Sequence, residues 1–132
     1  MDISSITIEC DIDTIYNFMS NIEKINLWSM GIHWDMNTKD NIVKGVSNYD
    51  QSVSYLKIVK KNNIKKIDYW IGKEIQNLTP RIYARITPTN DKDKNRLILV
   101  AFKTDDMDHE RWKQLKELHQ LELNTIKGLL SD

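Results

Sequence analysis

The sequence KELHQLELNTIKGLL, residues 116–130, has the spacing of an amphipathic helix, yet two ionisable side chains fall within its apolar stripe. At about 100° per residue, His119 and Glu122 lie in the same arc as the leucines and isoleucine that should face a core. An unpaired carboxylate buried in such a core is costly and is usually neutralised. A wet or ligand-filled hollow beside the helix would remove most of that cost, so the pattern predicts a helix that faces a cavity. The apolar members of the stripe are Trp112, Leu115, Leu118, Ile126, Leu129 and Leu130.

The residues before this stretch predict a capped helix that follows a series of strands. The carboxylates of DDMD, residues 105–108, can cap a helix that runs from about Asp108 to Leu130. The preceding segments are rich in β-branched and aromatic residues and are separated by short polar turns, which is typical of antiparallel strands. The expected strands cover residues 3–10, 32–36, 41–49, 52–61, 64–72, 81–87 and 96–104.

Between the first two strands the apolar spacing becomes helical. Asp11 or Asp13 can cap this helix, and Asn21 interrupts it, so we expect two short helices that end near Trp28. A seven-stranded sheet and a long amphipathic helix must bury their apolar faces on each other. We therefore predict a single α+β domain over residues 1–132, in which a curved, seven-stranded antiparallel sheet wraps around the long C-terminal helix. The two short helices after the first strand close one end.

Composition excludes several classes of function. The chain has 132 residues with 19 basic and 19 acidic side chains, so it lacks the positive charge of most nucleic-acid binders. No apolar run is long enough to cross a bilayer, and the N-terminus does not resemble a signal peptide. The single cysteine excludes an internal disulfide and cysteine-based zinc clusters. We expect a cytoplasmic protein without a cofactor, without nucleic acid as a partner and without membrane insertion.

Three segments resemble the START-like or SRPBCC superfamily, which includes birch-pollen-allergen-like proteins and polyketide cyclases. ITIECDIDTIYNFMSNIEKINLW, residues 6–28, is similar to the opening of that superfamily, with a strand, a short helix, a second turn and a tryptophan. IDYWIG at 67–72 and LTPRIYARITP at 78–88 resemble one of its small, uncharacterised branches. The resemblance implies a helix-grip fold that binds lipids, sterols, polyketides, hormones or quinones, and some members are cyclases or hydrolases. No motif of this chain can be transferred as catalytic.

His119 and Glu122 are the leading candidates for polar contacts in an otherwise apolar pocket. Their i, i+3 spacing lets both side chains reach one ligand group or each other. A structural alternative is that strand backbone or a nearby Tyr or Arg satisfies each of them. A metal lacks an evident third ligand, so no metal site is predicted.

Aromatic side chains form the second group of candidates. Trp28, Trp34, Tyr69 and Trp112 lie near the expected cavity ends or on strands. Such residues are more often core than ligand contacts. Trp28 and Trp34 flank the turn SMG, residues 29–31, which is a plausible cavity mouth.

The strand RIYARI, residues 81–86, leaves its orientation open. Arg81, Tyr83 and Arg85 share one face by strict alternation, and Ile82 and its alternating neighbours share the other. The isoleucines should point inward and the arginines outward. In the alternative, Tyr83 and Arg85 point inward, where Arg85 could hold a carboxylate or phosphate and pair with Glu122 in the empty protein.

Three hypotheses for function follow. The first is binding of a small hydrophobic molecule between the sheet and the C-terminal helix. The second is a cyclase-, dehydratase- or hydrolase-like enzyme that uses His119 and Glu122 as acid and base. The third is a protein-interaction module without a ligand. Whether the chain is an enzyme is left open, and so is its oligomeric state, with a homodimer as one alternative.

Overall fold

The computed structural model describes residues 1–39, 41–105 and 107–131. Its elements follow the predicted order, with one strand, two short helices, six more strands and a long helix. The helices are α1 (Ile12–Ser20), η1 (Ile22–Leu27), η2 (Asn62–Ile64), η3 (Ile75–Asn77) and α2 (His109–Leu130). The strands are β1 (Asp2–Ile8), β2 (Ile32–Lys39), β3 (Ile42–Ser47), β4 (Val53–Lys61), β5 (Lys66–Gly72), β6 (Thr79–Pro88) and β7 (Asn95–Ala101).

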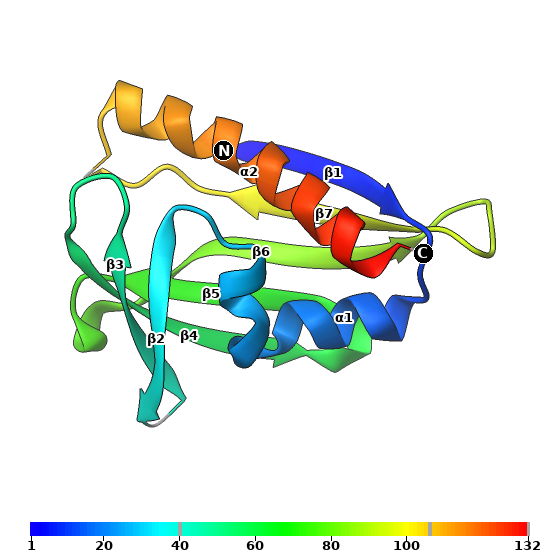
Figure 1. Cartoon of the computed structure of the whole chain (residues 1–132), viewed down its shortest axis with the longest axis horizontal. Helices are drawn as coiled ribbons and strands as arrows, with labels where there is room; N and C mark the ends of the chain where they lie inside the picture. The colour runs from blue at the N-terminus through cyan, green and yellow to red at the C-terminus, as the bar shows by residue number, and fades with distance from the viewer. Residues whose placement is uncertain (40, 106, 132) are drawn as a thin grey trace.

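All seven strands form one antiparallel sheet in the order β1-β7-β6-β5-β4-β3-β2. The sheet is curved, and α1 and α2 cover the same face of it (Figure 1). The predicted α+β helix-grip fold is therefore confirmed. The two sheet edges are β1, which packs against α2, and β2, which packs against η1.

The long helix begins where its cap was expected. A side-chain oxygen of Asp108 accepts a hydrogen bond from the backbone N–H of Arg111 at 2.7 Å. Leu123 is fully buried although it was not assigned to the stripe, and Leu129 is 51 % exposed, so its assignment to the buried face was wrong. Leu129 lies in the last turn of α2, where its neighbour Leu130 is only half-buried, so the core covers this turn incompletely. No helix of the described residues is both long and apolar enough to cross a bilayer.

The two short helices follow β1 as predicted. Asp11 caps α1 through the N–H of Thr14, and Asn21 separates α1 from η1 by ending one helix and capping the next. Helix α1 packs on β4, β5 and β6. The hydroxyl of Tyr69 donates to the backbone oxygen of Met19 at 2.6 Å, which links the middle of the sheet to the end of α1.

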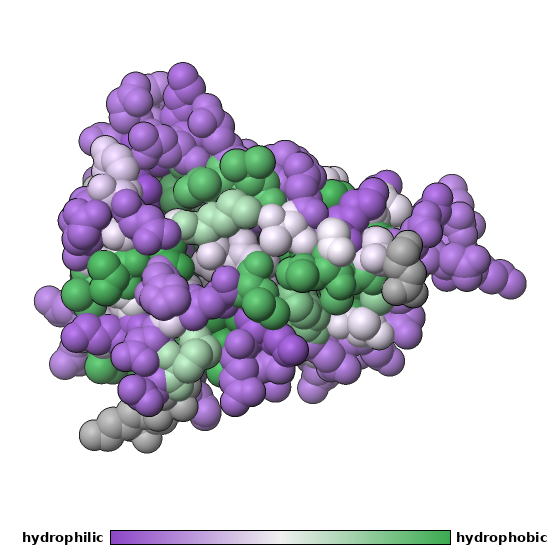
Figure 2. All heavy atoms as spheres, viewed as in Figure 1, coloured by the Kyte–Doolittle hydropathy of each residue, from purple (hydrophilic) through white to green (hydrophobic). Residues whose placement is uncertain are grey.

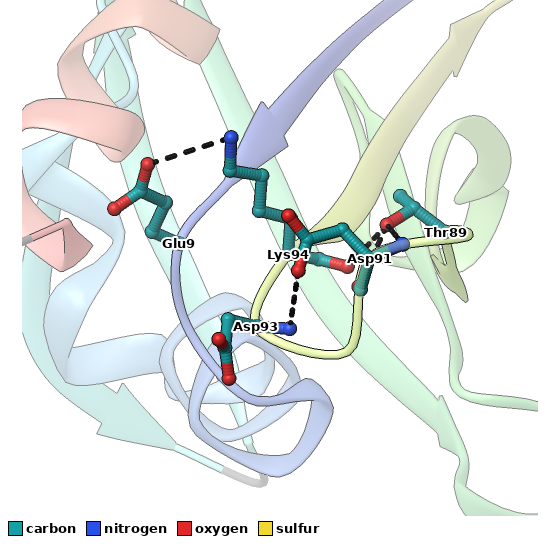
Figure 3. Close-up of polar contacts among 5 residues, drawn as sticks. All are labelled: Glu9, Thr89, Asp91, Asp93 and Lys94. Carbon is teal, nitrogen blue, oxygen red and sulfur yellow. Dashed lines mark hydrogen bonds and ion pairs between the residues drawn. The ribbon is translucent and has the colours of Figure 1, made fainter.

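The turn between β6 and β7 lies at the end of the molecule opposite the start of α2 (Figure 1). Its polar groups bond within the turn, as Figure 3 shows. The Thr89 hydroxyl bonds to the backbone oxygens of Asp91 and Lys94, and an Asp91 carboxylate oxygen accepts from the N–H of Asp93. The Lys94 ammonium lies 3.7 Å from a carboxylate oxygen of Glu9, beyond β1. The polar groups of this turn are thus largely satisfied by bonds within the turn itself.

The sheet face away from the helices carries a buried carboxylate. Asp68 is 5 % exposed, and its two oxygens lie 3.0 Å from the Lys61 ammonium and 3.3 Å from the Lys66 ammonium. Lys66 also lies over the ring of Tyr83, 4.4 Å from its centre. The charge of Asp68 is thus paired within the sheet itself.

Candidate ligand-binding cavity

A cavity of about 270 Å³ lies between the sheet and α2. A second chamber of about 40 Å³ lies deeper, toward the core. Six residues line both spaces and so mark the boundary between them: Ser29, Trp34, Ile71, Ile82, His119 and Glu122. Trp112, His119 and Glu122 line the larger space together with Trp34, whereas Tyr69, the other residue considered for the opposite wall, lines only the smaller one.

The start of α2 and the loop between β3 and β4 both line the cavity. Arg111 lies over the ring of Tyr49, 4.6 Å from its centre, and joins the helix to that loop. Asp50 from the loop and Lys73 after β5 also line this end of the cavity. On the face seen in Figure 2, apolar residues gather in the middle and polar residues surround them. Charged side chains therefore line this part of the cavity together with apolar ones.

His119 is fixed by a residue from the other end of the sequence. Its Nδ1 lies 3.3 Å from a carboxylate oxygen of Asp2, at the start of β1, and the side chain is buried. Burial lowers the pKa of His119, while the hydrogen bond and the charge of Asp2 act to raise it. A carboxylate only accepts hydrogen bonds, so this contact places the ring proton on Nδ1 and leaves Nε2 as an acceptor.

Glu122 is buried with little compensation for its charge. Within the described residues, the backbone N–H of Met30 donates a hydrogen bond to Glu122 Oε2 at 2.8 Å. Burial raises the pKa of Glu122 from 4.5 to about 7, and the bond from Met30 opposes that shift only in part. His119 and Glu122 thus have separate partners, and no hydrogen bond between their side chains occurs in the described part of the chain.

Trp34 forms a wall of the cavity and is held from two sides. The side-chain amide of Asn26 accepts from the N–H of Trp34 at 2.9 Å and donates to its carbonyl at 2.7 Å. Gly45 lies opposite Trp34 in the β2–β3 pair, and a Cβ atom at Gly45 would come within 2.4 Å of Cε3 of the indole. The absence of a side chain at Gly45 therefore leaves the space that the indole occupies.

A β-bulge changes the expected orientation of one residue in β6. Tyr69 pairs with Ile82 and Trp70 pairs with Pro80, so Arg81 is an extra residue in the ladder. As a result both Arg81 and Ile82 line the cavity, although strict alternation placed them on opposite faces. Sequence alternation alone gave no signal of this bulge.

Beyond the bulge, β6 has the orientation that buries its apolar residues. Ala84 and Ile86 are buried and Arg85 is exposed. The alternative in which Arg85 points inward and pairs with Glu122 is therefore wrong. Tyr83 is half-buried and lines neither chamber. Its ring lies beside that of Phe102, with centres 6.2 Å apart, and beneath the Lys66 ammonium.

The remaining predicted site residues divide between the two chambers. Trp34, Trp112, His119 and Glu122 line the larger one, while Trp28 and Tyr69 line only the smaller one. The rings of Trp28 and Tyr69 meet edge to face, with centres 5.8 Å apart. Sequence reasoning missed the partners of the two ionisable groups, because Asp2 is 117 residues from His119 and Met30 is 92 residues from Glu122.

Metal ligation has no basis in the described residues, since no three His, Cys, Asp or Glu side chains gather there in a way that could hold an ion.

Comparison with known proteins supports the fold through structure. No protein-family model and no curated protein sequence matches the chain. An uncharacterized protein from Bacillus thuringiensis superposes with a TM-score of 0.69 at 10% identity, over 98% of both chains. A START superfamily protein from Mycobacterium smegmatis gives 0.62 at 12% identity, over 97% of this chain and 94% of that one. The di-domain ARO/CYC BexL of the BE-7585A biosynthetic pathway gives 0.63 at 13% identity, over 96% of this chain and 44% of that one.

These likenesses and the sheet topology define the class of the protein. The chain has the START-like, helix-grip fold, with the cavity beneath the C-terminal helix. Identities of this size establish the fold alone, and many functions share one fold.

Proposed function

We propose that this protein binds one small, mostly apolar molecule in the cavity between the sheet and α2. The observation that carries the proposal is Glu122, a buried carboxylate with one backbone N–H as partner, on the wall of a 270 Å³ space. Stability alone would favour an apolar residue there, because an incompletely paired buried carboxylate costs free energy. Polar groups retained at such a cost are typical of functional sites.

The size and chemistry of the cavity support the same conclusion. Ligand pockets usually measure about 300–1,000 Å³ and combine apolar walls with a few polar groups. A volume of about 270 Å³ suits a single small molecule rather than a long-chain lipid. Trp34 and Trp112 supply large apolar surfaces, while His119 and Glu122 supply the polar groups.

The proposal is tested by filling the cavity. A Cβ at Gly31 would meet Leu118 Cδ1 at 3.8 Å and Leu115 Cδ2 at 3.9 Å, which are ordinary contacts, so Gly31→Ala is a matched control. Gly31→Phe extends a ring toward the same space. Native mass spectrometry of protein purified from its own host should show a retained small molecule in the wild type and Gly31→Ala, and none in Gly31→Phe. Retention by all three variants would contradict binding in this cavity.

A second candidate is acid–base catalysis on the bound molecule. It is favoured by two features together, the orientation of His119 by Asp2 and the pKa of about 7 at Glu122. A group that titrates near neutrality is suited to proton transfer. The test is to incubate the retained molecule with wild type and with His119→Gln and to follow its mass and chemical shifts. Conversion by the wild type alone supports an enzyme, and an unchanged molecule supports a binder.

A cytoplasmic location and a homodimer remain predictions. Light scattering coupled to size-exclusion chromatography tests the second, because a dimer of this 15.6 kDa chain would have twice the monomer mass. A monomer mass at all concentrations would contradict the prediction of a homodimer.

A further inference from the structure

The inner end of the cavity presents two hydrogen-bond acceptors on one helix. Glu122 Oε2 is bonded to Met30, while Oε1 has no hydrogen-bond partner within the described chain. His119 Nδ1 is bonded to Asp2, and Nε2 likewise has no partner there. Residues at i and i+3 project from the same side of a helix. A ligand group that reaches this end therefore meets a carboxylate oxygen and an imidazole nitrogen together.

The charges around this end favour a cation over an anion. Glu122 contributes a carboxylate, and Asp2 adds a second negative charge behind His119. Tyr69 also faces this region, but its hydroxyl is already donated to Met19, and both burial and the charge of Glu122 raise its pKa. Burial lowers the pKa of His119, which favours the neutral imidazole. Arg81, Lys73 and Arg111 also line the cavity, as do Asp50 and Asp108, but none of these three cations is among the causes that shift the pKa of Glu122 or His119.

We infer that the ligand carries a protonated primary amine, which binds between Glu122 and His119 while its apolar body lies against Trp34 and Trp112. This inference rests on the proposed function, because it names the ligand class of the same cavity. An ammonium group has three N–H donors and no acceptor, which matches two acceptors on the helix. Its positive charge also supplies the counter-ion that Glu122 lacks in the empty protein.

The alternatives match the site less well. A hydroxyl group donates a single hydrogen and carries no charge, so it leaves one acceptor unpaired and the carboxylate uncompensated. A carboxylate at the inner end would face Glu122 and Nε2 of His119 without a donor of its own. A charge-assisted bond to a buried carboxylate is roughly twice as strong as a neutral one, which gives the amine an advantage over an alcohol of the same shape.

Three matched probes test the inference, namely phenethylamine, phenethyl alcohol and phenylacetate. Their dissociation constants are measured by NMR titration at pH 6 and pH 8, where an alkyl amine remains protonated because its pKa is about 10. The ionised fraction of Glu122 rises from about a tenth to about nine tenths across this range, since its pKa is about 7. Phenethylamine should therefore bind about tenfold more tightly at pH 8, while phenethyl alcohol changes by less than about twofold.

Two variants locate the effect. Glu122→Gln should weaken phenethylamine binding at pH 8 by about tenfold or more and abolish its pH dependence. Glu117→Gln, at an exposed position of the same helix, should leave both unchanged. If Glu122→Gln is unfolded, the pH series on the wild type decides alone.

Each outcome separates this inference from the proposed function. Tighter binding of the alcohol or of phenylacetate than of the amine at pH 8 overturns the amine and leaves the cavity as a binding site. An affinity for the amine that does not depend on pH or on Glu122 overturns it as well. If no probe binds, the amine inference fails, and the Gly31→Phe comparison decides separately whether the cavity binds a ligand.

Discussion

Asp68 and Glu122 are two carboxylates with nearly equal burial, at 5 % and 7 % exposed, in opposite surroundings. Asp68 lies on the outer face of the sheet between two lysine ammonium groups, at 3.0 and 3.3 Å. Glu122 lies on the inner side and has one backbone N–H at 2.8 Å. Lysines of β4 and of β5 itself compensate the first charge, whereas the described residues give the second a single backbone N–H as its partner.

Burial alone therefore does not show whether the fold compensates the charge of a carboxylate. What distinguishes them is the number of partners that the fold supplies and the presence of open space beside the group. Asp68 has two cations and lines neither chamber, whereas Glu122 has one N–H and lines both. A buried charge with incomplete pairing next to a cavity is a functional candidate on physical grounds.

The largest expected effect is on the pH dependence of stability. The folded-state pKa of Glu122 is raised from 4.5 to about 7, so the stability from its neutral form is complete below pH 4.5 and is lost as the pH rises through 7. This difference between the unfolded and folded pKa lowers the free energy of unfolding by about 3 kcal/mol at pH 8. Glu122→Gln should recover most of this at pH 8 and little at pH 4.5, as measured by urea denaturation.

His119 also contributes to the pH dependence of stability, and its contribution must be separated from that of Glu122. Burial lowers its pKa, so its contribution to stability is lost as the pH falls through the usual histidine range, opposite to Glu122. Because Glu122→Gln retains His119, the difference between the variant and the wild type isolates the carboxylate. If the stability difference between Glu122→Gln and the wild type does not vary with pH, the pKa of Glu122 is not raised in the folded protein.

The second effect concerns the cavity wall that keeps Glu122 beside open space. Gly45→Ala places a methyl group where it would meet the Trp34 ring at 2.4 Å and Ile32 Cγ2 at 2.6 Å. The indole must move, and overpacking of this kind costs about 1–3 kcal/mol. Thermal unfolding should show the loss, and the indole resonances of Trp34 should shift. An unchanged melting temperature would show that Trp34 has a second position of equal stability.

Asp68→Asn should cost less, about 1–2 kcal/mol, because Lys61 and Lys66 are partly exposed and regain water when their partner is lost. The sign is opposite to that of Glu122→Gln at pH 8, which is the sharpest form of the comparison. Urea denaturation of the two variants in the same buffer measures both. Stabilisation by Asp68→Asn would mean that the lysines do not compensate the carboxylate.

The smallest effect is expected at the β6–β7 turn. Glu9 is 61 % exposed and lies 3.7 Å from Lys94, so Glu9→Gln should change stability by no more than about 0.5 kcal/mol. Raising the salt concentration should remove even that difference. A larger loss would show that this pair anchors the turn.

The order of elements and the burial of His119 and Glu122 could be predicted from the sequence, because both follow from local periodicity. The apolar stripe of α2 and the cap at Asp108 needed only neighbouring residues. The cavity followed from one further step, since a polar break in a buried stripe requires either partners or space.

What could not be predicted depended on contacts between distant residues. Asp2 and Met30 have no local signal that marks them as partners of α2. The bulge that turns Arg81 toward the cavity is a property of strand pairing. The outward orientation of Arg85, by contrast, is the one favoured from the apolar alternation of β6. The need for a glycine at position 45 depends on its contact with Trp34 across the strands, which the local sequence does not show.

The amide of Asn26 also affects how molecules of this protein behave toward one another. β2 is an edge strand, and open backbone groups at an edge are a template on which another chain can add a strand. By bonding both the N–H and the carbonyl of Trp34, Asn26 takes the place of that strand at one position. A second copy can extend the sheet past Trp34 only by displacing this amide, so the contact that fixes the cavity wall also opposes polymerisation through the sheet edge.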